Sequence, residues 1–152
     1  KTDLDETDRA LLRRLQEDAS TSLETLASEV SISLNTCWRR VKRLEETGVI
    51  ARRVVLVAPE AVGLDVTVFV AVSAGEHSDD WLTAFARTVS SIPEIVEIYR
   101  MAGEVDYLLK IMVANVGDYD RVYKKLISGV RLKDVSATFA MERIKNTTAL
   151  PV

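Results

Sequence analysis

Two predicted helices separated by a short turn, within residues 21–48, constrain the fold of this chain more than any other feature. Thr21 and Glu24 have the spacing of a capping box, which marks a helix start. Four apolar residues then recur at helical spacing and predict one buried stripe. They are Leu23, Leu26, Ala27 and Val30. The chain is predicted to turn at residues 31–32.

The second helix is predicted between Ser33, which suits an N-cap, and Gly48, which suits the left-handed position after a helix. Cys37, Val41 and Leu44 share one face by their i, i+4, i+7 spacing, and we expect that face to be buried. The other faces carry polar and cationic side chains. Asn35, Arg39 and Lys42 point away from the buried stripe, and Thr36, Arg40 and Arg43 flank it.

A helix-turn-helix places its second helix in the DNA major groove, with residues near the helix N-terminus at base edges. Arginine suits guanine there, and asparagine suits adenine. The alternative is a solvated basic face without a partner. The short turn, the two caps and the density of cations together favour DNA binding over that alternative. Trp38 is predicted to seat the helix from its flank rather than to stack on DNA.

Composition sets wider limits on the class of protein. The chain has 152 residues, enough for one domain or two small ones. Apolar residues make up 47% and charged residues 28%, as in soluble globular proteins. No apolar run approaches the length of about 20 residues that spans a membrane. A secretory signal pattern is absent, and because the sequence begins Lys-Thr without Met, we expect further residues to precede it.

The net charge of −3 conceals a local basic cluster. Residues 37–53 contain six Lys or Arg side chains against two Glu, and phosphate binding needs cations only at the interface. The single cysteine, Cys37, lies on the buried face of its helix, where a thiol behaves as a small apolar group. A lone buried thiol predicts a protein of the reducing cytoplasm.

An earlier helix is predicted over residues 5–18, with Asp5 as its cap. Its apolar stripe consists of Leu11, Leu12 and Leu15. We expect this helix to pack beneath the helix-turn-helix pair and to supply its core. We therefore assign residues 1–50 to a DNA-binding domain of three helices.

A linker is predicted over residues 51–65, between that domain and the rest of the chain. The β-branched run within it predicts a strand, and the fold class of the N-terminal part is therefore a winged helix-turn-helix. Arg52 and Arg53 interrupt the run. These two arginines either reach DNA phosphates or are solvated charges on the strand.

Residues 66–152 read as strand, helix, strand, strand, helix, strand. An apolar run at residues 66–74 predicts a central buried strand. The later elements are a helix over residues 79–91 that buries Leu82, Phe85, Ala86 and Val89, strands over 95–101 and 107–113, a helix over 117–128 and a strand over 135–144. This order is the split βαβ pattern of a ferredoxin-like α+β domain.

The sheet of such a domain has helices on one face only. Its predicted strands carry more apolar residues than one layer of helices can cover. These residues are Val96, Ile98, Leu108, Met112, Phe139 and Met141. An apolar second face on a small domain predicts a partner surface, and a two-fold dimer that packs sheet against sheet is the simplest closure.

Five motifs follow one another along nearly the whole chain. They are LDETDRALLRRLQED, CWRRVKRLEETGVI, PEAVGL, GEVDYLLKI and IKNTTALP. In this order and spacing they resemble the Lrp/AsnC family of bacterial and archaeal transcription regulators, also called feast/famine regulators. One departure is Ser31 in the turn, where the family often has glycine.

The resemblance implies a DNA-binding domain joined to a ferredoxin-like sensing domain, the RAM domain. It implies double-stranded DNA as a partner, dimers that assemble into octamers, and an amino-acid effector bound between dimers near the loop at residues 101–107. Gly103 permits a close backbone approach, and Asp106 of the Gly-x-x-Asp-Tyr pattern suits an α-ammonium group. The alternative is that both residues merely form the hairpin turn.

The sequence thus predicts two sets of binding residues. The DNA set consists of Ser33, Asn35, Thr36, Arg39 and Lys42 on the second helix, with Arg40, Arg43, Arg52 and Arg53 on phosphates. The effector set consists of Met101, Gly103, Asp106, Tyr107 and Thr138, with Thr147 and Thr148 of the tail as further candidates.

An enzyme is the main alternative class, since related folds include haem-pathway decarboxylases that use histidine. The one histidine here, His77, lies in a polar loop, and there is no spaced Cys/His cluster, Gly-rich phosphate loop or nucleophile elbow. We therefore predict a regulator without enzyme activity, cofactor, metal or membrane association. A third possibility is a ligand-binding module that has lost DNA binding, and the intact cationic helix argues against it.

Overall fold

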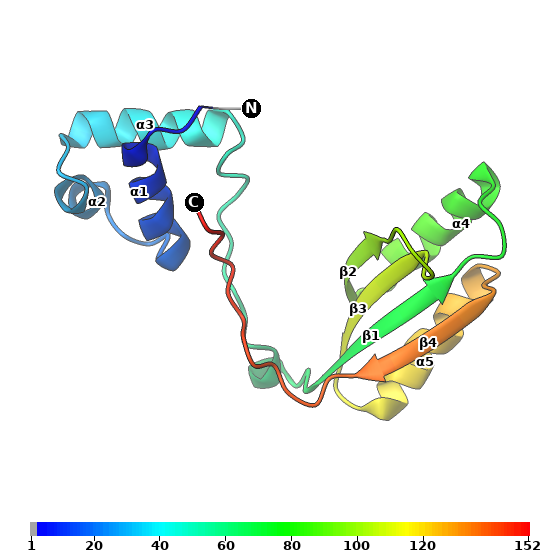
Figure 1. Cartoon of the computed structure of the whole chain (residues 1–152). Helices are drawn as coiled ribbons and strands as arrows, with labels where there is room; N and C mark the ends of the chain where they lie inside the picture. Colours follow the sequence, from blue (N-terminus) through cyan, green and yellow to red (C-terminus); the bar gives the residue numbers. More distant parts are fainter. Residues whose placement is uncertain (1–2) are drawn as a thin grey trace. The chain divides into compact units, whose positions relative to one another are not determined.

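The computed structural model describes residues 3–152, which form two compact units. The first unit runs to Leu56 and also includes residues 145–152, and the second comprises Val57–Ile144. The elements are α1 (Glu6–Glu17), α2 (Leu23–Glu29), α3 (Leu34–Glu46), the 3₁₀ helix η1 (Pro59–Val62), β1 (Val66–Ser73), α4 (Asp79–Ser90), β2 (Ile95–Arg100), β3 (Tyr107–Val113), α5 (Val116–Gly129) and β4 (Asp134–Phe139) (Figure 1). Within residues 3–152, no helix is both long and apolar enough to cross a bilayer.

Capping side chains determine where the first two helices begin. The Asp5 carboxylate accepts a hydrogen bond from the Asp8 N–H at 2.8 Å, and Asp8 reciprocates, so that α1 has a capping box. The predicted cap of the next helix, Thr21, is wrong. Ser22 occupies that position, because its extended backbone lets its hydroxyl accept from the Thr25 N–H at 3.1 Å.

The turn between α2 and α3 requires a left-handed residue. Ser31 supplies it with φ +57°, and the Ile32 N–H then donates to the Ala27 carbonyl at 2.9 Å. The predicted Ser33 cap is confirmed, as is the left-handed Gly48 after α3 with φ +72°. The core beneath the three helices includes Leu11, Leu26, Ala27, Cys37 and Val41, so the helix-turn-helix fold is confirmed.

The strand predicted in the linker does not form within the chain. Residues 49–58 pair with no strand among residues 3–152. Val55 and Leu56 are 89% and 67% exposed there. The β-branched side chains favour extended backbone, but a strand also needs a neighbour for its N–H and C=O groups. The wing expected of a winged helix-turn-helix is therefore absent from the single chain.

The second unit is an antiparallel four-stranded sheet in the order β2-β3-β1-β4, with α4 and α5 on one face (Figure 1). Val70 lies at its centre, opposite Leu109 of β3 and Ala137 of β4. The predicted ferredoxin-like order is confirmed, although β4 ends at Phe139 rather than at residue 144. Antiparallel pairing places the end of β1 beside the starts of β3 and β4, so three loops gather at that end of the sheet.

The core of the second unit lies between the sheet and the two helices. Strand β1 is central, as predicted, but only one of its faces is fully buried, through Val68, Val70 and Val72. Helix α4 buries Trp81, Phe85, Thr88 and Val89. The predicted burial of Leu82 and Ala86 is wrong, because the indole of Trp81 rotates the buried stripe away from them.

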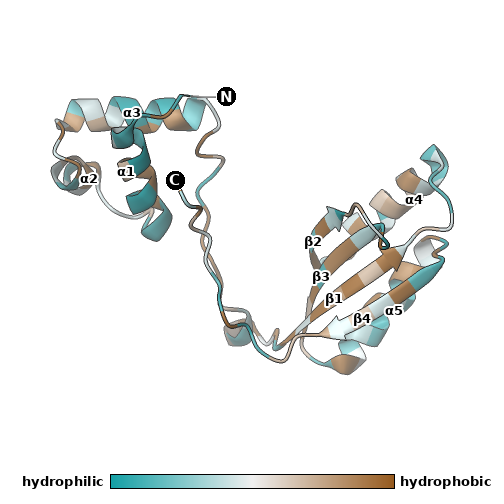
Figure 2. Cartoon of the chain, in the orientation of Figure 1, coloured by the Kyte–Doolittle hydropathy of each residue, from teal (hydrophilic) through white to brown (hydrophobic). Residues whose placement is uncertain are grey.

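The opposite sheet face is uncovered by any helix of the unit, as predicted. Strand alternation places Phe69, Leu108 and Met112 there, together with an ion pair between Lys110 and Glu97 at 2.7 Å. Ile98 and Phe139, two of the six apolar residues that one layer of helices was not expected to cover completely, lie on the helix side by their register with Val70 and Val68. Met141 lies beyond the end of β4. Figure 2 shows that β1 and β3 are mostly apolar, with a few paler or hydrophilic bands.

Candidate DNA-binding surface and effector site

The exposed face of α3 carries three of the predicted DNA-binding residues. Asn35, Arg39 and Lys42 are exposed, while Cys37, Val41 and Leu44 on the other side are buried. Arg39 makes no ion pair with any residue within 3–152, whereas Lys42 lies 3.7 Å from Glu46. An amide and two cations therefore line the face of the helix that a major groove would receive.

Trp38 extends this face along one flank of α3. It is 49% exposed, and its predicted role in seating the helix from the flank stays a prediction. The Lys42 ammonium lies 5.0 Å from the centre of its ring, which is a cation–π distance. Leu34, one turn earlier, is also exposed.

Ser33 and Thr36 lie together at the N-terminus of α3. The Ser33 hydroxyl accepts from the Thr36 N–H at 3.2 Å and donates to the Thr36 hydroxyl at 2.8 Å. These bonds use the Ser33 side chain to complete the cap. Both residues lie where a helix-turn-helix meets DNA, but their first role is to begin the helix.

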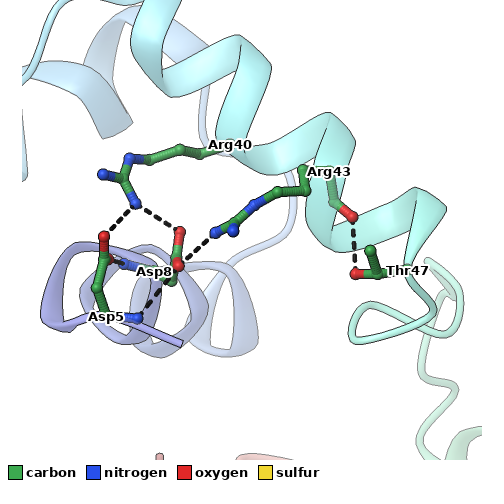
Figure 3. Close-up of polar contacts among 5 residues, drawn as sticks. All are labelled: Asp5, Asp8, Arg40, Arg43 and Thr47. Carbon is green, nitrogen blue, oxygen red and sulfur yellow. Dashed lines mark hydrogen bonds and ion pairs between the residues drawn. The ribbon is translucent and has the colours of Figure 1, made fainter. Parts of the chain in front are cut away.

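Arg40 and Arg43, which were predicted to contact phosphates, both bind carboxylates of α1, and their phosphate contacts stay predictions. The Arg40 guanidinium donates to Asp5 at 2.7 Å and to Asp8 at 2.9 Å, and Arg43 donates to Asp8 (Figure 3). The Asp8 side chain is 1% exposed, so these bonds join α3 to α1 at a buried carboxylate. Hydrogen bonds from the Asp8 N–H and Arg40 lower the pKa of Asp5, and Asp5 raises the pKa of Arg40.

Arg53 is also engaged inside the first unit. Its guanidinium donates to the Glu45 carboxylate at 3.2 Å and to the Ala19 carbonyl at 3.0 Å. Arg53 therefore joins the linker to α3, and its predicted phosphate contact stays a prediction. Arg52 is exposed and makes no ion pair with any described residue, so its predicted phosphate contact stays a prediction.

The predicted effector loop joins β2 to β3. The Met101 N–H donates to the Asp106 carbonyl at 2.8 Å and closes the loop, and Gly103 within it has φ +147°. One Asp106 carboxylate oxygen accepts from the Ala74 N–H at 2.7 Å, and the other lies 3.5 Å from His77. Asp106 therefore fixes this loop against the loop that follows β1, a role that the sequence did not reveal.

Two predicted effector residues lie elsewhere. The Tyr107 ring is buried in the core, 4.6 Å from Phe85 and 5.9 Å from Trp81 between ring centres, because alternation along β3 turns it to the helix side. Thr138 lies on β4 opposite Phe69, and strand β1 separates β4 from the β2–β3 hairpin that carries the loop. The structure does not bring Thr138 and the loop together within one chain.

A hollow of about 430 Å³ opens at the same end of the sheet. Its walls come from the loop after β1 and the loop before β4, and they carry Glu76, Arg131 and Lys133. The indole N–H of Trp81 donates to the Arg131 carbonyl at 2.6 Å and anchors the second of these loops. These charged residues lie next to the effector loop only because three separate loops meet, and no local motif could have marked them.

Comparison with known proteins decides the family. The AsnC-type helix-turn-helix domain matches residues 4–45, and the Lrp/AsnC ligand binding domain matches residues 67–150. The chain belongs to the Lrp/AsnC family. It is accordingly a DNA-binding transcriptional regulator, and its helix-turn-helix match contains the exposed face of α3. Its ligand binding domain contains the effector loop and the hollow beside it.

Individual members of the Lrp/AsnC family support this assignment. The glutamate uptake regulatory protein of Zymomonas mobilis is 49% identical over 149 residues, which cover 98% of this chain and 91% of that protein. An AsnC family transcriptional regulator from Agrobacterium tumefaciens superposes with a TM-score of 0.94 at 49% identity, covering 97% of each chain. A Neisseria meningitidis transcriptional regulator in complex with L-Met gives 0.93 at 33% identity, covering 98% of this chain and 97% of that one.

Proposed function

We propose that this Lrp/AsnC regulator reads DNA bases with Asn35 and Arg39 and contacts phosphates with Lys42 and Arg52. The exposed face of α3 supports the proposal, because it presents Asn35, Arg39 and Lys42 while Arg40 and Arg43 are bound to Asp8, and Arg52 is exposed in the linker. A side chain that reads a base discriminates between sequences, whereas a phosphate contact contributes equally to all of them. The two roles are therefore separable by experiment.

Arg39→Ala tests the base-reading role. We expect it to weaken binding to the specific site by about 1–3 kcal/mol and to leave binding to random DNA nearly unchanged. Lys42→Ala is the matched variant for a phosphate contact, and it should weaken both and reduce the salt dependence of binding by about one phosphate. Affinities measured by fluorescence anisotropy at several salt concentrations separate the two patterns. Equal losses on specific and random DNA with Arg39→Ala contradict base reading.

We further propose that the effector is an amino acid bound at the end of the sheet where the effector loop meets the charged hollow. Arg131 and Lys133 suit an α-carboxylate, while Glu76 and the outer oxygen of Asp106 suit an α-ammonium group. The likeness to a relative in complex with L-Met supports this class of ligand. Side chains from a second copy are expected to complete the pocket.

A thermal-shift screen against the common amino acids tests the effector. A ligand that binds only the native state stabilises it by about 2.7 kcal/mol at 100 times its Kd. The decarboxylated amine of each active amino acid is the matched control, since it keeps the side chain but loses the carboxylate. We expect a shift with the amino acid alone, and Lys133→Ala should abolish it. No shift with any amino acid contradicts the proposal.

We also propose that the uncovered sheet face packs against its copy in a two-fold dimer, and that dimers assemble further into octamers. The exposed linker run 54–57 gains a strand partner in such a dimer. Phe69→Asp tests the interface, and Leu82→Asp on α4 is the matched control, because Phe69 and Leu82 are 39% and 38% exposed. Sedimentation should show dissociation for Phe69→Asp alone. Dissociation with both variants, or with neither, contradicts this interface.

A further inference from the structure

The C-terminal tail, residues 145–152, belongs to the DNA-binding unit although it follows the last strand of the effector unit. Gln16 of α1 holds it by its backbone. The Gln16 amide donates to the Leu150 carbonyl at 3.2 Å and accepts from the Leu150 N–H at 2.7 Å. Arg13 adds a bond to the Val152 oxygen at 3.0 Å. One side chain thus recognises both polar groups of a single tail residue.

The docked tail also closes apolar surface of the first unit. It forms one wall of a hollow of about 590 Å³, and Leu12 and Leu15 of α1 and Leu56 of the linker line the other sides. Tail and linker run side by side in Figure 1. A three-helix unit of this size has little core. A segment that lies beside these leucines therefore contributes appreciably to the stability of α1 in the unit.

Helix α1 contacts the recognition helix as well as the tail. Asp8 in its first turn binds Arg40 and Arg43 of α3, and Gln16 in its last turn binds the tail. The two residues are about 12 Å apart along one helix. A helix of this length moves as a rigid body, so the position that the tail imposes on α1 is passed to α3 through the buried carboxylate.

The tail is connected to the effector unit by a short length of chain. The Ala140 N–H, directly after β4, donates to the Thr67 carbonyl at 2.9 Å and fixes the start of this connection. Ten residues later, Leu150 is bound to Gln16. We propose that the docked tail positions α3 for DNA through α1, and that Gln16 is the positioning residue. The proposal goes beyond the DNA contacts and the effector, since it requires neither a new DNA contact nor a bound ligand.

Three variants of the full-length protein test the proposal. Gln16→Ala removes both hydrogen bonds to Leu150. Leu150→Pro removes the backbone N–H that donates to the Gln16 amide oxygen. Leu150→Ala is the matched control, because it keeps the N–H and truncates a side chain that is 70% exposed. None of the three touches the exposed face of α3. Alanine favours helix more than glutamine does, so Gln16→Ala is expected to fold.

Hydrogen exchange and DNA affinity are measured well below the melting temperature. Gln16→Ala and Leu150→Pro should each accelerate amide exchange in α1 and weaken specific DNA binding by about five-fold. The salt dependence should stay unchanged, because no phosphate contact is lost. Leu150→Ala should behave as the unmodified protein. The combined Gln16→Ala, Leu150→Pro protein should lose no more than Gln16→Ala alone, since Gln16→Ala already removes the bond that Leu150→Pro breaks.

Several results overturn the proposal. Unchanged DNA affinity in a protein whose tail exchanges faster means that the tail docks without positioning α3. Additive losses in the combined variant mean that Gln16 and Leu150 act separately. A reduced salt dependence means that Gln16→Ala disturbs a DNA contact instead. Amino-acid binding in the thermal-shift assay is an independent readout, so failure of this proposal is distinguishable from failure of the effector proposal.

Discussion

Asp8→Asn tests how strongly the buried carboxylate holds α3 to α1. The substitution keeps the shape of the side chain but removes the charge that Arg40 and Arg43 share. Loss of one partner from a fully buried ion pair costs about 3–5 kcal/mol. Asp8 is 1% exposed, but the side chains of Arg40 and Arg43 are 26% and 45% exposed and remain partly solvated. We therefore expect a loss of about 2–3 kcal/mol in the free energy of unfolding of the first unit.

Such a loss is large for a small unit. It corresponds to a fall of about 10–20 °C in the melting temperature of the first unit, measured by calorimetry or by circular dichroism at the helix signal. Asp5→Asn is the matched control. It removes a charge from the same cluster, but the Asp5 side chain is 54% exposed, and asparagine is also a good N-cap. The second unit provides an internal reference and should melt unchanged.

The comparison of the two variants shows whether burial of the Asp8 carboxylate determines its contribution to stability. Equal losses for Asp8→Asn and Asp5→Asn refute the reasoning, because burial of the Asp8 carboxylate then makes no difference to its contribution. An unchanged melting temperature for Asp8→Asn also refutes the reasoning. It would mean that water solvates the guanidinium groups of Arg40 and Arg43 as favourably as the Asp8 carboxylate binds them. The expected pattern also requires weaker DNA binding by Asp8→Asn, because Arg40 and Arg43 no longer fix the angle of α3.

Two further predictions concern the turns and the response to acid. Ser31→Gly should stabilise the first unit by about 0.5–1 kcal/mol. Glycine removes the strain of the left-handed backbone at this position, and we expect this gain to exceed the cost of the larger conformational entropy of the unfolded chain. Gly48→Ala should destabilise the first unit by about 1 kcal/mol, because alanine is strained at a φ of +72°. An added Cβ would contact nothing, so backbone strain is the whole of the expected cost. Urea unfolding measures both, and changes of the same sign contradict this account. Hydrogen bonds from the Asp8 N–H and from Arg14 lower the folded-state pKa of Asp5 and Glu29 below the ordinary 3.8 and 4.5. Their stabilisation is therefore complete above those values and is lost as pH falls below them, which acid titration followed by circular dichroism should show as unfolding of the first unit below about pH 4.

Local patterns predicted much of the first unit. The i, i+4, i+7 spacing of Cys37, Val41 and Leu44 gave the buried face of α3, and the opposite face with Asn35 and Arg39 followed from helix geometry. The patterns placed Arg39 away from the buried stripe and Arg40 on its flank, but they did not reveal that Arg40 binds a carboxylate of α1. One of these neighbours is exposed and the other binds Asp8, which lies 32 residues earlier in the sequence.

In the second unit, too, local patterns predicted the elements, and tertiary structure determined which face each side chain occupies. Strand and helix order predicted the ferredoxin-like topology, because hydrophobic period and turn residues are local properties. The face on which Tyr107, Ile98 and Phe139 lie depends on register, and a shift of one residue exchanges the two faces. The sequence therefore placed these strands correctly but did not determine which face each of the three side chains occupies.

The sequence by itself determined the element types, the caps at Asp5, Ser33 and Gly48, and the family, since each depends on residues close together in the chain. Tertiary structure alone decided which cations remain available to DNA, which loops surround the effector site, and that the tail lies on α1. These features depend on groups far apart in the sequence that fold together. Their energies depend on burial and on the distances between the groups in the folded protein. Neither quantity follows from the spacing of residues along the chain.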